Sequence, residues 1–479
     1  MKLIRWLLLF VLVLGCTMAA SALTTLVQEM TVVQGTTIAQ GTPLQVSPDR
    51  PTPEVPVAKP LSVLKLDLKK LQETLDRNDI AGAIQDVEVS WKQQYENYYQ
   101  GKFTTRLLSA DQIGYSLNRV AQLTGKKAAL IYVIPTPEHL ELLLVPPDGQ
   151  LSHRRVTAAT RTRLTETVKA FRSGVVNAGS QPSDYLPAAQ QLYQWIISPL
   201  EATLKAQQID TLIFCLGGGL RGVPIAAFHD GQHFLIERYS FATIPAFSLL
   251  DQHPSRLAGT KVLAMGASQF QNESPLPAVP VELTTISQLW QGESWLNQDF
   301  TLAKLKDRRS ASSFGLIHLA THAILAPGTA EASYIQFWDQ PIRLNRLRDL
   351  GLNFPVVQLL VLSACQTALG DPNAELGFAG LAVQSGAKAA LASLWSVSDA
   401  GTLVLMVNFY QRLKAAPIKA EALRQTQLAM LRGQTRLQKS AAKGGIAQRA
   451  VASELLAAAN ADLSHPYYWA SFTIIGNPW

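Results

Sequence analysis

The sequence is poor in cysteine and in charged residues. Only three cysteines, Cys16, Cys215 and Cys365, occur among 479 residues, too far apart for a disulfide framework or a cysteine-rich zinc site. Charged residues make up 16% of the chain against 47% apolar ones, which excludes an overall disordered chain and allows a large core. The net charge of +7 is spread thinly, so no nucleic-acid partner is expected. A His-Glu-x-x-His zinc motif is also absent, and we expect neither a metal nor a cofactor.

Long apolar runs are also missing, except for a short one at the N-terminus. Lys2 and Arg5 precede the apolar run Trp6–Leu14, and the small residues 20–22 follow it. This is the pattern of a secretory signal peptide over residues 1–22, cleaved after Ala22. The mature protein would then be exported, to the periplasm or the extracellular space.

Two other interpretations of this N-terminal segment remain open. The segment could stay uncleaved as a membrane anchor, or Val13-Leu14-Gly15-Cys16 could be a lipobox that makes Cys16 a lipid-bearing N-terminus. Because no later segment has 18 consecutive apolar residues, contact with a membrane is expected only through this segment.

Composition divides the rest of the chain into three parts. Residues 23–60 are rich in threonine, glutamine and then proline, which predicts an extended linker. Residues 61–105 have leucines and aromatics at spacings of three and four, interrupted at 77–79, which predicts a helical hairpin. Residues 106–479 alternate strand-like and helix-like segments and are expected to form the main domain. Within it, residues 433–461 are either a loose helix or an insertion.

The main domain is predicted to be an α/β structure. Short, fully apolar runs read as strands, at 128–134, 140–145, 211–216, 261–265, 315–320, 357–363, 387–394 and 472–475. The first two are bounded by turn residues and predict a hairpin. Helical patterns separate several of the others, at 158–172, 185–206, 281–291, 376–385, 399–413 and 419–432. This order favours a mainly parallel central sheet with helices on both faces, in which 357–363 is central and beside 315–320.

Two of these strands lead into reactive side chains. The run 315–320 continues into Thr321-His322, and the run 357–363 continues into Ala364-Cys365. Chemistry in parallel sheets sits beyond the carboxyl ends of the strands, and a thiol needs a base beside it to be a nucleophile near neutral pH. The alternative is that Cys365 is a small core residue; His318, inside its strand, is interpreted as a core residue.

The motifs around these two residues resemble those of the CHAT family, caspase-like domains often joined to helical repeats. The sequence Ile-His-Leu-Ala-Thr-His at 317–322 resembles its histidine motif, and Leu-Ser-Ala-Cys-Gln-Thr-Ala at 362–368 its cysteine motif. Four further segments are similar to the family, at 219–224, 375–382, 393–399 and 466–479. The similarity is greatest to signal-bearing members from cyanobacteria. Gly217–Gly219 stands where the family commonly has an aspartate, and is expected to form only a turn.

This resemblance implies a caspase-like sandwich from the clan of caspases, gingipains and separases. It implies Cys365 as the nucleophile, His322 as the general base, and an oxyanion hole from the amides of Cys365 and Ala323. The family usually has glycine where this chain has Ala323, so a positive φ there would strain the hole. The substrate would be a protein or peptide, and a helical-repeat or regulatory protein could be a partner.

Acidic residues after these motifs are candidates for substrate binding. Asp399 follows a segment that resembles one in separases, and could bind a basic side chain of the substrate; alternatively it is a helix N-cap. Asp371 and Glu375 are weaker candidates, and Glu375 could equally be a first-turn acid. Trp395 is expected in the core or in the wall of the pocket.

Two classes of function therefore remain open. The first is a cysteine endopeptidase with a Cys–His dyad that cleaves after a basic residue. The second is a catalytically weak caspase-like module that acts as a binding or regulatory platform. The pair of motifs favours the first, whereas Ala323 favours the second.

Overall fold

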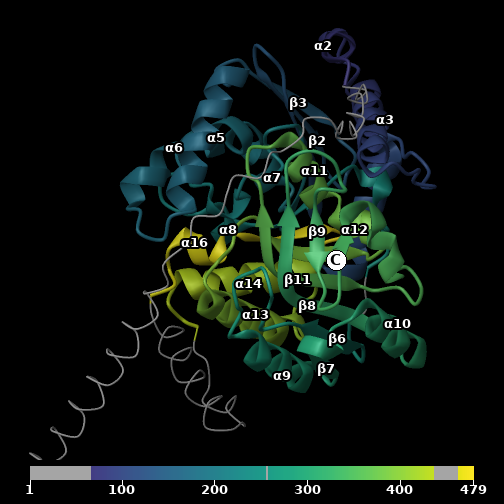
Figure 1. Ribbon diagram of the computed structural model, residues 1–479. Coiled ribbons are helices and arrows are strands. Elements are labelled where there is room, and N and C mark those ends of the chain that lie inside the picture. The colour runs from purple at the N-terminus through teal and green to yellow at the C-terminus, as the bar shows by residue number, and fades with distance from the viewer. Residues whose placement is uncertain (1–65, 255–256, 436–461) are drawn as a thin grey trace, which may run out of the picture. The chain divides into compact units, whose positions relative to one another are not determined.

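A mixed β-sheet is the centre of the structure, a computed structural model that describes residues 66–254, 257–435 and 462–479 (Figure 1). In these residues the sheet has thirteen strands. They are β1 Ala128–Pro135, β2 Leu140–Val145, β3 Ser152–Val156, β4 Thr211–Leu216, β5 Ser240–Ile244, β6 Lys261–Gly266, β7 Glu293–Leu296, β8 Phe314–Leu325, β9 Tyr334–Gln336, β10 Pro341–Arg343, β11 Leu359–Thr367, β12 Ala389–Ser393 and β13 Phe472–Gly476.

The sheet contains two sets of parallel strands. Across it the order is β10-β9-β8-β11-β12-β13-β5-β4-β1-β2-β3, with β6 also paired to β8, and β7 to β6. The first set consists of β7, β6, β8, β11 and β12, each parallel to the next. The second set consists of β13, β5, β4 and β1, which are also parallel to one another. The sets meet where β13 runs antiparallel to β12. The predicted placement of β11 in the interior of the sheet beside β8 is confirmed.

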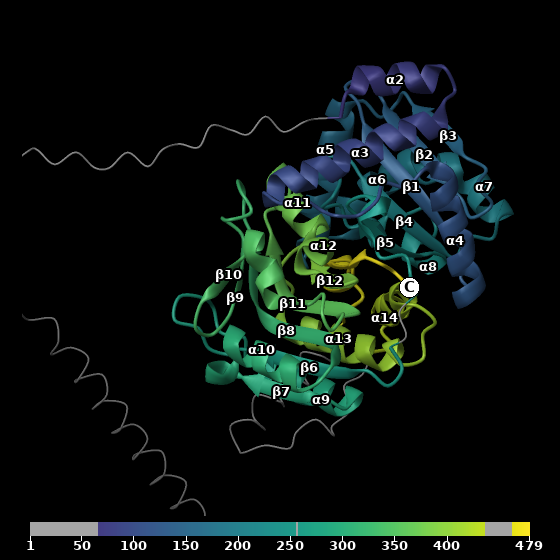
Figure 2. The ribbon, with the colours of Figure 1, turned by 90° about the vertical axis from the view of Figure 1, so that its right-hand side faces the viewer.

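Helices cover both faces of this sheet. They are α2 Leu68–Asp76, α3 Ile80–Tyr99, α4 Ala110–Thr124, α5 Arg161–Val175, α6 Pro182–Ile196, α7 Glu201–Ala206, α8 Leu235–Arg238, α9 Val279–Trp290, α10 Leu302–Ala311, α11 Pro372–Ala379, α12 Leu381–Ser385, α13 Asp399–Leu413, α14 Lys419–Leu431 and α16 Pro466–Trp469. Around β8 and β11, helices α9 and α13 pack on one face and α11 on the other (Figure 2).

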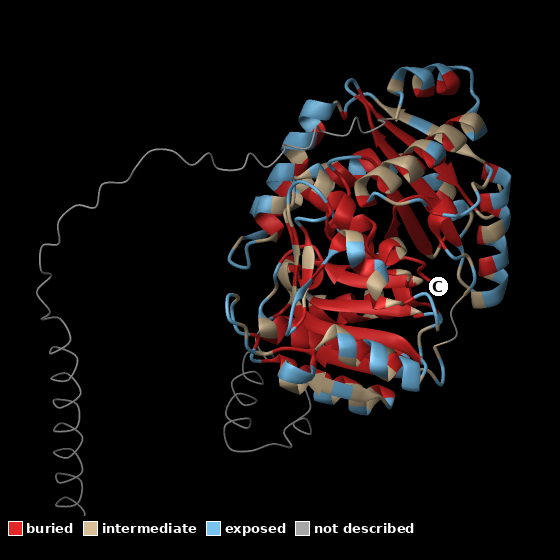
Figure 3. Ribbon diagram, turned by 45° about the vertical axis from the view of Figure 1, so that its right-hand side comes forward, coloured by how far each residue is buried: buried red, intermediate tan, exposed pale blue. Residues whose placement is uncertain are grey.

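The apolar runs explain why the sheet needs cover on both sides. All eight residues of β1 and all six of β4 are buried. Alternate residues of β1 belong to different hydrophobic clusters, one of which includes helices α2, α3 and α4, the other α5 and α6. Strands with two apolar faces are stable only between two layers of helices. Figure 3 shows the result, with buried strands inside and exposed residues on the outer faces of the helices. The predicted α/β architecture is confirmed.

The predicted helical hairpin is present as α2 and α3, and it packs on the main sheet. The buried carboxylate of Glu88 on α3 accepts hydrogen bonds from the Tyr132 hydroxyl of β1 at 2.7 Å and from the amides of Phe247 and Ser248, both at 2.8 Å. At the other end of α3, the Tyr99 hydroxyl donates to the carbonyl of Gly377 on α11 at 3.0 Å (Figure 2). Helix α3 therefore contacts β1 and also α11, the helix that packs on β8 and β11.

Several strands were not expected from the sequence. Strand β3 is largely polar, β7 has four residues of which none is buried, and β9 and β10 have only three residues each, so they lack a long apolar run. Strand β5 was not predicted either, although all five of its residues are buried, because Ser240 and Thr243 interrupt its apolar run. The predictions for residues 1–60, including the signal peptide, Cys16 and the linker, lie outside the described residues, as does most of 433–461. Among the helices that are described, none is long and apolar enough to cross a membrane.

Candidate active site

His322 and Cys365 lie on neighbouring parallel strands. In the pairing of β8 with β11, His322 lies opposite Ala364, and Cys365 lies opposite Ala323. The two residues are thus one register position apart, and in a regular pleat their side chains point to opposite faces of the sheet: His322 is half-buried, whereas Cys365 is buried. Both strands continue through them, which corrects the expectation that each residue follows the end of its strand. The reason is additional pairing: Ala323 and Ile324 of β8 also pair with β9, and this prolongs β8 to Leu325.

An irregularity in this pairing lies directly before the two residues. Leu362 is paired with Leu319, but the next pair is Ala364 with His322. Two residues of β8, Ala320 and Thr321, therefore lie opposite the single residue Ser363. Bulges of this kind turn side chains out of the regular alternation and occur often beside active sites.

The thiol of Cys365 is fully buried. Its exposed fraction is 0%, and burial raises its pKa to about 12, although a hydrogen bond from the amide of Gln366 acts in the opposite direction. Among the described residues, no hydrogen bond joins this thiol to His322. In this arrangement Cys365 is a neutral thiol.

The imidazole of His322 has other partners. Its Nε2 lies 2.8 Å from the carbonyl oxygen of Ser274, and its ring makes an edge-to-face contact with Phe270 at 4.6 Å between centroids. Because a carbonyl can only accept, Nε2 carries the proton in this bond, which leaves Nδ1 as the basic nitrogen. The segment 267–278, between β6 and α9, therefore holds the imidazole.

The buried thiol leads to a labelling prediction. A thiol with a pKa of about 12 has roughly 10³-fold less thiolate at pH 7 than a free cysteine of pKa about 8.5. Alkylation of Cys365 by iodoacetamide at pH 7 should be slower in the native protein by at least this factor than in urea. Mass spectrometry distinguishes it from Cys16 and Cys215. Equal rates in the two states would show an exposed, ionisable thiol.

Asp399 is within electrostatic range of His322, but it is not the N-cap of α13. That position is taken by Ser398, whose hydroxyl oxygen accepts from the amide of Gly401, so the N-cap interpretation of Asp399 is wrong. The Asp399 carboxylate instead accepts from the amide of Ala278 at 3.1 Å. Burial raises its pKa, and nearby Glu282 raises it further, whereas the charge of His322 lowers it. A half-buried carboxylate and the imidazole are thus within electrostatic reach.

The other candidates for substrate binding are engaged elsewhere. Trp395 is buried and donates from Nε1 to the carbonyl of Tyr467 at 3.1 Å. Asp371 is the N-cap of α11 and accepts from the amides of residues 373 and 374. Glu375 is completely buried, forms an ion pair with Arg172 at 2.5 Å, and accepts from the amide of Gly370 at 3.2 Å. Asp399 interacts electrostatically with His322, whereas these three side chains have other partners.

Ala323 is not strained at its position. It lies in β8, in register with Cys365 on one side and with Ile335 on the other. The non-glycine residues of positive φ in the described chain do not include it. Alanine at position 323, where the family usually has glycine, therefore causes no backbone strain.

Three buried polar residues are in contact, His318 with Glu282 and with Tyr410, and the sequence did not predict this contact. His318 is completely buried, as its interpretation as a core residue predicts. Its Nε2 lies 2.9 Å from the Glu282 carboxylate of α9, and its Nδ1 lies 3.2 Å from the Tyr410 hydroxyl of α13. These three residues are far apart in the sequence, so no motif indicates their contact. No cluster of three or more potential ligands that could hold a metal occurs among the described residues.

The geometry defines an α/β protein with a histidine and a cysteine on adjacent strands of a mainly parallel sheet. The sequence matches the CHAT domain family over residues 186–477, which is more than half of the chain. The chain belongs to this family, and the resemblance of its motifs is confirmed at that level. No curated protein matches the sequence.

The solved structures to which the chain is similar include a separase–securin complex and a gingipain. The separase–securin complex of Saccharomyces cerevisiae is 9% identical, with a TM-score of 0.44, and the match covers 84% of this chain and 34% of that one. The complex of the pro- and mature domains of Porphyromonas gingivalis RgpB is 10% identical, with a TM-score of 0.37, covering 73% and 78%. The chain thus matches about a third of the length of the separase chain.

Proposed function

We propose that this protein is a caspase-like cysteine endopeptidase that cleaves after a basic residue. Cys365 is the nucleophile and His322 the general base. The observation that carries the proposal is that both residues lie on the neighbouring strands β8 and β11, within the two motifs of a chain of the CHAT family. The substrate is a protein or peptide, and a regulatory or helical-repeat protein is the partner we expect.

The reaction would proceed through an acyl-enzyme. His322 takes the thiol proton as the sulfur of Cys365 attacks the peptide carbonyl, and the amides of Cys365 and Ala323 stabilise the oxyanion. The imidazolium then gives its proton to the leaving amine as the C–N bond breaks. Water, deprotonated by His322, hydrolyses the thioester and restores the thiol.

The arrangement described above is a resting form under this proposal. The thiol is buried and neutral, and His322 donates to Ser274. Activity requires that the segment 267–278 release the imidazole and that the thiol become accessible. Binding of a substrate or a regulatory partner could supply the free energy for this change.

The same features favour the second candidate function, a binding or regulatory platform without turnover. If Cys365 never leaves its buried position, the fold remains suitable for binding a partner but not for attack on a carbonyl. The discriminating measurement is covalent capture of Cys365 by a peptide electrophile with arginine at its reactive end. Capture that depends on His322 supports the peptidase, and none under any condition supports the platform.

The Asp399 carboxylate is expected to set the preference for basic residues. Asp399→Asn retains an oxygen that can accept from Ala278 but removes the charge. Cleavage after Arg or Lys should fall about 10- to 100-fold, the loss of one charge-assisted hydrogen bond of about 1.5–3 kcal/mol. Cleavage after Leu should change little. The measurement is kcat/KM on four peptides that differ only in Arg, Lys, Asp or Leu before the cut.

Asp111→Asn is the matched control for this experiment, because Asp111 is an exposed acid on α4. It should leave the whole profile unchanged. An equal loss on all four peptides for Asp399→Asn would assign this residue to the packing of α13 on α9, and not to substrate recognition.

A further inference from the structure

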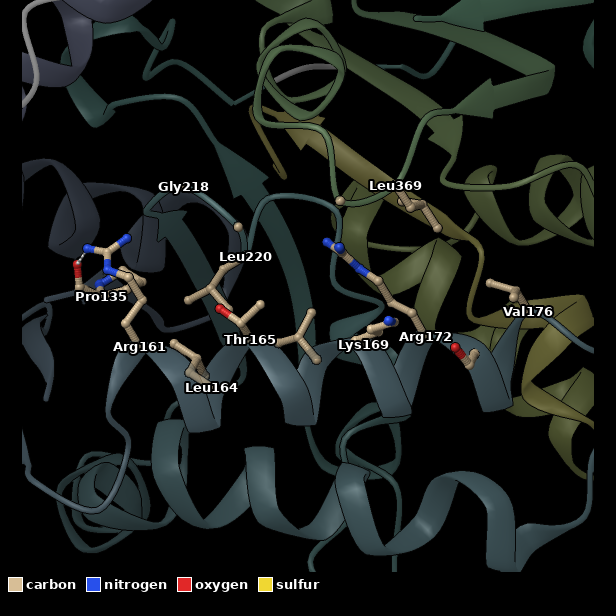
Figure 4. A pocket seen from close by; sticks show the side chains of 14 residues that line it. Pro135, Arg161, Leu164, Thr165, Lys169, Arg172, Val176, Gly218, Leu220 and Leu369 are labelled. Atoms are coloured by element: carbon tan, nitrogen blue, oxygen red, sulfur yellow. Dashed lines mark hydrogen bonds between the residues drawn. The ribbon is translucent and has the colours of Figure 1, made fainter. Parts of the chain in front are cut away.

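A groove with a basic lining lies beside the segment that follows Cys365. Its volume is about 510 Å³, within the range of ligand sites. One wall is α5, and the other is formed by the turn 218–220 after β4 and by residues 369–370 after β11 (Figure 4). The sequence predicted only a turn at Gly217–Gly219. The groove forms because the fold brings the two wall segments opposite the same helix.

The charge of this groove is positive. Arg161, Lys169 and Arg172 line it, and no acidic residue is among those that do. Arg172 is already bound to Glu375, whereas Arg161 donates only to the carbonyl of Pro135 at 3.0 Å. Lys169 is exposed and has no hydrogen-bond or ion-pair partner in the described part of the chain. Two cations are therefore free to bind an anion.

Apolar side chains lie between the cations. The buried side chains of Leu164 and Val168 of α5 line the groove. Leu220 and Leu369 line it from the opposite wall (Figure 4). Thr165 and Ser173 add hydroxyl groups at the rim of α5. The groove thus offers two free cations, Arg161 and Lys169, beside an apolar surface.

The length of the groove selects among anionic ligands. The two free cations, Arg161 and Lys169, are eight residues apart on one helix, which is about 12 Å at 1.5 Å per residue. One phosphate or carboxylate cannot reach both. An extended peptide covers this distance in about four steps of about 3.3 Å each.

We propose that this groove binds an extended acidic segment of a protein partner, with acidic side chains near both ends and apolar ones between. The proposal does not depend on peptidase activity. Occupancy would also act on the segment after Cys365, because Leu369 and Gly370 form part of the wall and the Arg172–Glu375 pair holds the amide of Gly370.

Binding can be measured by fluorescence anisotropy with the full chain carrying Cys365→Ala, so that turnover plays no part. The probe is a labelled five-residue peptide with aspartate and glutamate at its ends and leucines between. We expect the double variant Arg161→Gln/Lys169→Gln to weaken binding about tenfold, through the loss of two partly exposed ion pairs. Raising the salt concentration should weaken binding as well.

Arg163→Gln is the matched control, because Arg163 is on the same helix but lies over the ring of Trp195. It should bind the probe as tightly as the parent. Three results would overturn the proposal: equal binding by the double variant, equal binding of the peptide with Asn and Gln ends, or complete displacement of the probe by inorganic pyrophosphate of similar affinity. Slower hydrogen exchange at residues 366–371 on binding supports the action on the segment after Cys365; unchanged exchange refutes that part.

Discussion

Replacing Cys365 with alanine is expected to lower peptide hydrolysis by at least about 10³-fold, because the acyl-enzyme cannot form without the sulfur. The change removes only one buried atom, so the Tm should change by a few degrees at most. The measurement is the turnover of an arginyl peptide by parent and variant at equal concentration, together with a thermal melt. Turnover by the variant at the parental rate would assign the activity to a different site.

His322→Ala completes this test. Loss of a general base lowers rates by about 10²- to 10⁴-fold, and the remaining reaction should rise with pH as more thiolate forms without assistance. His253→Ala is a control, since the imidazole of this exposed histidine pairs with Asp251 and is not part of the proposed dyad. A flat pH dependence in His322→Ala would contradict the proposed role of His322.

Removal of Arg172 is the second large effect that we expect. Arg172→Ala leaves the carboxylate of Glu375, which is completely buried, without a cation. Breaking a buried ion pair from one side costs about 3–5 kcal/mol. The packing around this ion pair is too tight to relax after the change. Even one added Cβ atom at the neighbouring Gly222 would lie 2.9 Å from Leu369 and 3.2 Å from Glu375. Urea unfolding should show the loss in the free energy of unfolding.

Two comparisons separate this pair from a general effect on α5. Lys169→Ala, on the same helix but exposed and unpaired, should change the free energy of unfolding by no more than about 0.5 kcal/mol. The double variant Arg172→Met/Glu375→Leu should recover most of the loss, because an apolar pair needs no desolvated charge. If Arg172→Ala were as mild as Lys169→Ala, the pair would not be what holds the segment after Cys365.

The elements of the core could be predicted because their signals are local. Strand β4 and helix α13 begin and end where the apolar run and the helical period place them. The motifs around His322 and Cys365 were sufficient for the family, because each is contained within six or seven consecutive residues. Strands β3, β5, β7, β9 and β10 were missed, since they are short or interrupted by polar residues and their pairing depends on neighbours.

The sequence by itself determined the fold class, the family and the two residues proposed for the chemistry. Only the tertiary structure decided what surrounds them. It placed Asp399 within electrostatic range of His322, and Glu375 in a buried pair with Arg172, 203 positions away in the chain. It also prolonged β8 and β11 through His322 and Cys365 and buried the thiol. The physical reason is that apolar periodicity acts over a few residues, whereas a carboxylate takes its role from whichever cation or amide the packing of distant elements brings to it.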